Sequence, residues 1–191
     1  IKDVKLYKGG IPSKYGGRLS SVLDIYQKEG NSNDFKLTGG IGLVSSRLLA
    51  EGPIEKGKSS FLIGGRASYA HLFLPLFNNE NKAYFYDLNS KINYRFNDQN
   101  NLFLSTYFGK DVFGISDNFV NKYGNSVVNL RWNHLYSDKL FSNLSIIYSD
   151  YFYGLILDFV GFEWDSGITN FNLKYDFKHY INNDFKLSYG I

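Results

Sequence analysis

Three groups of residues have the side chains that catalysis or ligand binding uses, but none has the spacing that this chemistry needs. The pairs Gly9-Gly10 and Gly16-Gly17 could approach a phosphate, yet a phosphate-binding loop leads into a helix, and no helical period follows here. The 3 histidines lack the short intervals of a metal site. We therefore predict no catalytic residue, no metal site and no cofactor, and we expect that the protein is not an enzyme. The third group is a set of carboxylates near one expected loop, without the defined cleft of an acid–base pair: Asp150, Asp158, Glu163 and Asp165.

The spacing that does carry information is an alternation of apolar and polar residues. Between Ala83 and Phe96, residues such as Tyr84 and Leu88 occupy one phase, and residues such as Asp87 occupy the other. Successive side chains of a strand point to opposite faces, so this stretch predicts a strand with one apolar and one polar face. The stretch 169–177 repeats the pattern.

The length of these strands and their aromatic residues indicate an outer-membrane barrel. The first strand of the hairpin 83–108 has about 14 residues, whereas a strand in a soluble protein has roughly 5–6. A membrane strand needs roughly 9–11 residues and carries aromatic side chains at both interfaces. Aromatic residues make up 18% of the chain. In a barrel the polar phase faces the lumen, so the charged residues that we expect there are Arg66, Lys91, Arg95, Arg131, Lys174 and Asp176.

The connections between the expected strands alternate in length. Short turns are predicted near Gly57, Asp98, Asp138 and Asn182, and a further turn near Ser45-Ser46. Longer segments are predicted at 71–82, 114–125 and 154–166, and this alternation is typical of an up-and-down membrane barrel. The fold class that we predict is all-β: part of an antiparallel transmembrane β-barrel, with about nine strands in 31–191.

The composition is consistent with this fold and excludes other classes. No apolar run is long enough for a transmembrane helix. The net charge of +3 is not gathered in a basic stripe, so we expect no nucleic-acid partner. The sequence starts without a secretory signal, and nine strands would leave an open edge in lipid. We therefore expect a fragment of a longer outer-membrane protein.

Residues 1–30 have a different pattern, with two short strands around a turn-rich segment. Glycine supplies positive φ angles in such turns, and Pro12 fixes its own φ. The pattern residues in the turn are Gly9, Gly10, Tyr15, Gly16, Gly17 and Arg18. The two segments read Val4-Lys5-Leu6-Tyr7-Lys8-Gly9-Gly10-Ile11-Pro12 and Tyr15-Gly16-Gly17-Arg18-Leu19-Ser20-Ser21-Val22-Leu23-Asp24-Ile25.

This pattern resembles the C-terminal end of the plug domain of TonB-dependent outer-membrane receptors, most of all those of Bacteroidetes. Glu51-Gly52-Pro53-Ile54 is similar to the family's first periplasmic turn. The resemblance implies that 1–30 is the end of a plug and that 31–191 is the start of a barrel of 22 strands. It also implies active import of a scarce ligand across the bacterial outer membrane. The siderophore, glycan, cobalamin and peptide classes stay open.

The resemblance implies partners as well: the TonB complex, through a segment outside this sequence, and outer-membrane lipid. A surface lipoprotein is a further partner that the sequence leaves open. Lys14 and Arg18 are expected to meet carboxylates of the barrel wall. Two alternatives stay open, a structural or assembly barrel that binds a protein, and a soluble all-β binding module.

Overall fold

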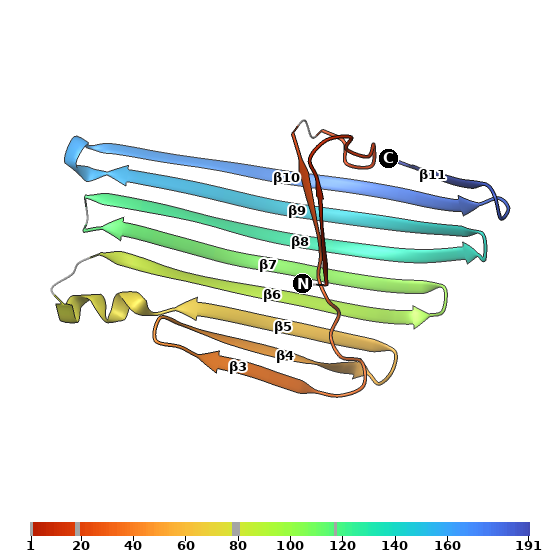
Figure 1. The fold of residues 1–191 in the computed structure, drawn as a ribbon, viewed down its shortest axis with the longest axis horizontal. Helices are drawn as coiled ribbons and strands as arrows, with labels where there is room; N and C mark the ends of the chain where they lie inside the picture. The colour runs from red at the N-terminus through yellow and green to blue at the C-terminus, as the bar shows by residue number, and fades with distance from the viewer. Residues whose placement is uncertain (1, 18–19, 78–80, 117) are drawn as a thin grey trace.

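The computed structural model describes residues 2–17, 20–77, 81–116 and 118–191, and these residues form an all-β protein with two sheets. The all-β prediction is confirmed. The small sheet is an antiparallel hairpin of β1 (Asp3–Tyr7) and β2 (Val22–Tyr26). The large sheet has nine antiparallel strands, each paired with its neighbours in sequence (Figure 1). Its strands are β3 (Lys36–Ile41), β4 (Ser45–Glu55), β5 (Ser59–Ser68), β6 (Lys82–Asn97), β7 (Asn100–Ile115), β8 (Phe119–Ser137), β9 (Leu140–Leu157), β10 (Phe162–Tyr180) and β11 (Lys186–Gly190).

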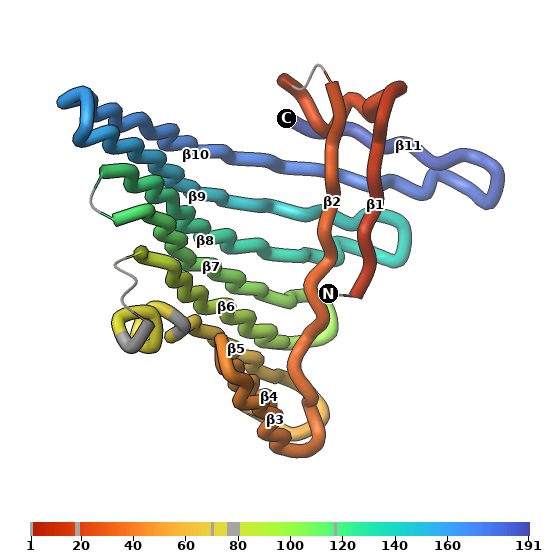
Figure 2. Tube along the Cα trace, turned by 60° about the vertical axis from the view of Figure 1, so that its left-hand side comes forward, coloured from red at the N-terminus to blue at the C-terminus, as the bar shows by residue number. Residues whose placement is uncertain are grey.

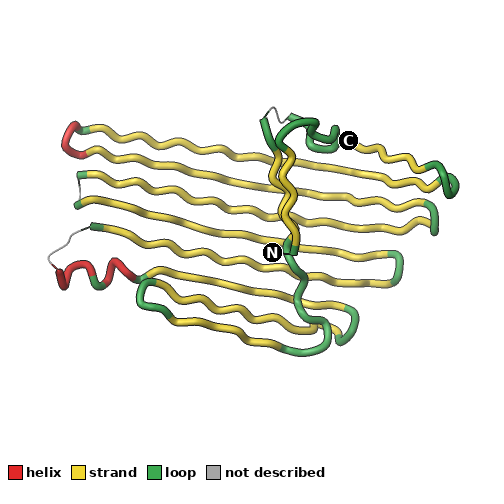
Figure 3. The backbone as a smooth tube through the Cα atoms, in the orientation of Figure 1, coloured by secondary structure: helices red, strands yellow, loops and turns green. Residues whose placement is uncertain are grey.

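The two ends of the large sheet differ in their connections. Tight turns join β4 to β5, β6 to β7 and β8 to β9 at one end, close to the predicted positions. Three short 3₁₀ helices lie at the opposite end (Figure 3): η1 (Ala70–Leu72), η2 (Leu74–Phe77) and η3 (Asp158–Val160). No helix among the described residues is long and apolar enough to cross a membrane.

Three predicted connections are wrong in position or length. β4 already begins at Ser45, and the turn before it is closed by the Gly42 N–H donating to the Ser45 carbonyl at 3.0 Å. The expected loops at 114–125 and 154–166 are much shorter, since β7 ends at Ile115 and β8 begins at Phe119, and β9 ends at Leu157 and β10 begins at Phe162. β7 and β9 pair with residues 119–126 on both sides and satisfy their backbone groups. β6 to β10 are therefore 16 to 19 residues long.

The pairing register separates the side chains of the large sheet into two faces, since residues directly opposite each other share a face. We call the face that carries Lys91 and Lys174 the inward face, and the other the outward face. The outward face is mainly apolar, and its apolar side chains are exposed: Phe171 is 69% exposed. On the inward face polar groups are buried, and Lys91 is only 8% exposed. The buried apolar side chains among the described residues are Leu62, Phe103 and Val112.

The hairpin β1–β2 runs across the strands of the large sheet (Figure 1), and a turned view places it on one side of that sheet (Figure 2). The hydrogen bonds that residues 14–30 make to Lys91 and Lys174 identify that side as the inward face. The hairpin lies within 1–30 and the large sheet within 31–191. That these ranges are the end of a plug and the start of a barrel stays a prediction.

Candidate functional site

Residues 27–30 attach the end of the hairpin to β4, β5 and β6. The Lys91 ammonium donates to the Gln27 carbonyl at 3.0 Å. The Asn93 amide donates to the Glu29 carboxylate at 3.2 Å. Gly30 lies so close to β5 that an added Cβ would stand 2.0 Å from the Phe61 carbonyl oxygen, so the approach requires glycine.

An ion pair fixes the same segment to the next strand. The Lys28 ammonium lies 3.0 and 3.1 Å from the two carboxylate oxygens of Glu51 on β4. Glu51 pairs directly with Leu62, which pairs with Lys91, so all three side chains share the inward face. Charged groups of the sheet therefore hold residues 27–30 at two places.

A second contact lies at the far side of the sheet, on β10. The Lys174 ammonium donates to the Lys14 carbonyl at 2.6 Å and lies 5.6 Å from the centre of the Tyr15 ring. The Tyr15 hydroxyl donates to the carboxylate of Asp24 on β2. Burial and this hydrogen bond raise the pKa of Tyr15 above its ordinary value. The protonated hydroxyl closes the turn onto β2.

The predicted residues of that turn fall into two sets. Gly10 and Gly17 have positive φ angles of 58° and 72°, a backbone conformation that glycine adopts without steric cost. Gly9 and Gly16 have open space around an added Cβ. Arg18 lies outside the described residues. Lys14 places its ammonium over the Tyr15 ring, 4.5 Å from its centre, and forms no ion pair with a carboxylate in the described part of the chain.

The six charged residues predicted for the polar phase all lie on the inward face. Lys91 and Lys174 hold the N-terminal segment, and the Arg131 guanidinium carbon lies 4.3 Å from the centre of the Phe103 ring. Arg66 donates from Nε to the Asp87 carboxylate. Arg95 and Asp176 make no side-chain hydrogen bond or ion pair within the described ranges. That these residues line a barrel lumen stays a prediction.

The inward face also holds buried polar atoms that lack a protein partner in the described residues. They are the Arg131 Nε and the side-chain carbonyl oxygens of Asn93, Asn101, Asn121, Asn129 and Asn133. Unpaired polar groups that are buried in this way are rare in proteins.

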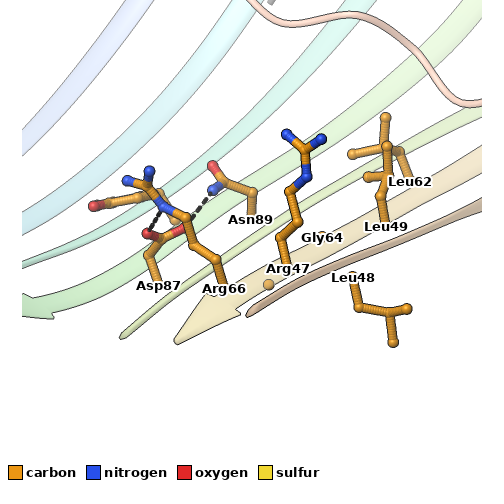
Figure 4. A pocket seen from close by; sticks show the side chains of 10 residues that line it. Arg47, Leu48, Leu49, Leu62, Gly64, Arg66, Asp87 and Asn89 are labelled. Atoms are coloured by element: carbon orange, nitrogen blue, oxygen red, sulfur yellow. Dashed lines mark hydrogen bonds and ion pairs between the residues drawn. The ribbon is translucent and has the colours of Figure 1, made fainter. Parts of the chain in front are cut away.

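A cavity of about 280 Å³ opens on the inward face between β4 and β7 (Figure 4). Arg47, Arg66 and Asp87 stand in one row across three strands, because Arg47 pairs with Arg66 and Arg66 with Asp87. Asn89 donates to the second Asp87 oxygen at 3.4 Å, and Tyr107 contributes to the lining. Arg47 is exposed and forms no hydrogen bond or ion pair with the described residues.

Sequence reasoning placed Asp87 and Asn93 on the polar phase of their strand, but it missed Arg47 and Glu51 as members of this face. Their phase could have placed them on the polar side, but only the pairing register shows which of them meet. The row of Arg47, Arg66 and Asp87 beside the cavity depends on the pairing register of three strands. The alternation of apolar and polar residues does not determine that register.

The other residues that could act in catalysis or bind a metal are dispersed. Asp150 accepts a hydrogen bond from the Thr169 hydroxyl at 2.7 Å, and Asp165 lies 3.4 Å from the Lys122 ammonium. Both contacts lie on the outward face, so the carboxylates do not face each other across a cleft. His134 lies 2.8 Å from the Asn100 side-chain oxygen. No group of three potential metal ligands occurs within 2–17, 20–77, 81–116 and 118–191.

The comparisons with known proteins give no match: no family model, no curated protein and no solved structure is similar to this chain.

Proposed function

We propose that this chain is part of a TonB-dependent outer-membrane transporter, with the large sheet as a sector of the barrel and residues 1–30 as the end of the plug. One observation carries the proposal: the large sheet has an exposed apolar face, and its opposite face is polar and bonded to the N-terminal hairpin. A soluble protein buries the apolar face of a sheet. In a membrane barrel the apolar face meets lipid and the polar face meets water or a plug.

The outward face has the dimensions for this role. On β6 its residues run from Tyr84 to Tyr94, ten steps that cover roughly 33 Å at about 3.3 Å per residue. A strand tilted by about 40° would then span roughly 25 Å, the height of the apolar band of a membrane barrel.

Polar side chains within this band pair with one another. The hydroxyls of Ser90 and Thr106, directly opposite each other on β6 and β7, are 2.8 Å apart. A hydroxyl without a partner is costly in hydrocarbon, and this pairing removes the cost from two groups at once.

Aromatic rings gather on the outward face toward the tight-turn end, as expected for side chains at a membrane interface. Tyr175 and Phe177 have ring centres 4.4 Å apart, and Phe177 stacks on Tyr189 at 5.2 Å. Trp132 lies 5.2 Å from His134 on the neighbouring part of the same face.

The sheet has two edge strands, β3 and β11, whose outer sides are unpaired in the described residues. Lipid does not tolerate open edges, so the proposal requires further strands that close the barrel, about 22 in all as in the family that the sequence resembles. The activity is ligand import driven through TonB, with the plug as the gate. No residue is assigned a catalytic role.

The test uses the full-length protein in bacterial outer membranes. We expect it to resist extraction by alkaline carbonate, to need detergent for release, and to bind the periplasmic domain of TonB through its N-terminal segment. Release without detergent would identify a soluble binding module. A detergent-dependent protein that does not bind TonB would identify a structural or assembly barrel.

A further inference from the structure

We propose that Arg47 and Arg66 form a binding site for an oxyanion, a carboxylate or a phosphate, on the ligand that the protein imports. This inference rests on the proposed function, because it requires that the imported ligand reaches the inward face. The proposal adds a ligand class, an anion, to a transporter whose sequence leaves the ligand open.

The first observation is an excess of positive charge in one row of the sheet. Arg47 and Arg66 face each other directly on β4 and β5. Like charges at directly opposite positions destabilise a sheet, so this arrangement favours an anion that both can bind. Asp87 compensates one of the two arginines. Asp111, the next carboxylate on this face, forms no ion pair with either of them.

The second observation is the way in which Asp87 is occupied. Its carboxylate accepts from Arg66 Nε and from Asn89, and it is buried, with 8% of the side chain exposed. Arg66 is 61% exposed; its guanidinium carbon lies 5.3 Å from the centre of the Phe85 ring, and its two terminal nitrogens have no hydrogen-bond partner among the described residues. Asp87 thus orients Arg66 from the Nε side and leaves the end of the guanidinium group for another acceptor. In Figure 4 both side chains leave the sheet on the same side; the Arg66 side chain leans toward Asp87, and the Arg47 side chain stands apart from it.

The third observation is the space beside the two arginines. Gly40 pairs with Arg47, Gly109 pairs with Asp87, and Gly64 precedes Arg66 by two residues, so all three lie on the same face. An added Cβ at Gly64 would stand 2.9 Å from Leu49 Cδ1, and one at Gly109 would stand 2.4 Å from the Tyr107 hydroxyl oxygen. The absence of side chains here keeps the cavity open and lets Tyr107 lie across Gly109. Guanidinium groups bind carboxylate and phosphate oxygens with paired, charge-assisted hydrogen bonds.

The site can be tested by chemical labelling of arginine in the full-length protein, without knowledge of the ligand. Phenylglyoxal modifies accessible arginines, and the rate at each residue is read by peptide mass spectrometry. The probes are inorganic phosphate and citrate, with chloride at equal ionic strength as the reference. Arg95, which lies on the same face outside the cavity and has no side-chain partner, is the internal control.

We expect phosphate or citrate at about 20 mM to slow the labelling of Arg47 and Arg66 by roughly threefold or more, with no change at Arg95. The probe that slows the labelling more, phosphate or citrate, shows whether the site prefers a phosphate or a carboxylate. Arg47→Gln should reduce the protection of Arg66, and Asp87→Asn should give protection at lower anion concentration because Arg66 gains a free donor.

Three results would overturn the proposal. Arg47 could be protected before any anion is added, which would mean that another part of the full chain pairs with it. Arg95 could be protected to the same extent, which would mean general screening. Protection could also be missing altogether. Each of these results leaves TonB binding and membrane extraction unaffected, so failure of the anion site is distinct from failure of the transporter proposal.

Discussion

The outward and inward faces of the large sheet are built on the same backbone but have opposite chemistry. On β10, Phe171 and Leu173 point outward, whereas Asn172 and Lys174 point inward. The two outward side chains are exposed and apolar; of the two inward ones, Lys174 holds the N-terminal segment and Asn172 is polar and exposed. Strand hydrogen bonds are identical for both faces, so the backbone does not explain the difference; the proposed transporter explains it by lipid on one side and water or protein on the other.

The largest effect is expected from a charge on the outward face. In the full-length protein in lipid vesicles, Phe171→Arg should lower the free energy of unfolding by about 2–4 kcal/mol, the cost of a cation near the middle of the bilayer. The measurement is urea-induced unfolding followed by tryptophan fluorescence. Asn172→Arg, one residue away on the inward face, is the control and should change the value by less than about 0.5 kcal/mol. Equal losses for both variants would mean that the two faces meet the same surroundings.

The next effect concerns the close approach of residues 27–30 to β5. Gly30→Ala should cost about 1–3 kcal/mol, because the new methyl group overlaps the Phe61 carbonyl and the segment must move away. Gly16→Ala is the matched control, since nothing lies near its added Cβ and its effect should stay small. Thermal unfolding of both variants gives the comparison, and a neutral Gly30→Ala would show that the segment is not held against the sheet.

A smaller effect is expected when the polar contact on the inward face is removed. Lys91→Met deletes the hydrogen bond to the Gln27 carbonyl, and a bond from a charged donor is worth about 1.5 kcal/mol, so amide hydrogen exchange in residues 27–29 should rise roughly tenfold. The control is Lys178→Met, an exposed lysine of the same face. Unchanged exchange in the Lys91 variant would mean that this bond does not hold the segment.

The smallest effect belongs to the hydroxyl pair in the outward band. Ser90→Ala leaves Thr106 without its partner and should cost about 1 kcal/mol. The double variant Ser90→Ala/Thr106→Val removes both polar groups and should return to within about 0.5 kcal/mol of the parent, as is expected when no unpaired group remains. Additive losses in the double variant would argue against a shared hydrogen bond.

The sequence predicts the faces well because the alternation is local. The period of two in 83–96 and 169–177 is enough to place Lys91 and Lys174 on one face with Arg66 and Arg131. It is also enough to find the tight turns near Gly57, Asp98 and Asp138, since short polar segments interrupt it there.

What the sequence does not predict depends on distant pairing. The Lys91 contact with Gln27 joins residues 64 positions apart, and the Arg47–Arg66–Asp87 row needs the register of three strands. The loops expected at 114–125 and 154–166 were wrong because residues such as Asn121 and Lys122 look loop-like alone and are strand residues once β7 and β9 flank them.

The measurement that tests the two-faced sheet most directly is the accessibility of spin labels at two adjacent positions of β10. The 191 residues contain no cysteine, so Leu173→Cys and Asn172→Cys each give one labelling position in this part of the chain. In the full-length protein in lipid vesicles, the label at 173 should be relaxed mainly by oxygen, which concentrates in lipid. The label at 172 should be relaxed mainly by a water-soluble nickel chelate. If both labels respond to the nickel chelate alike, the outward face does not meet lipid and the transporter proposal fails.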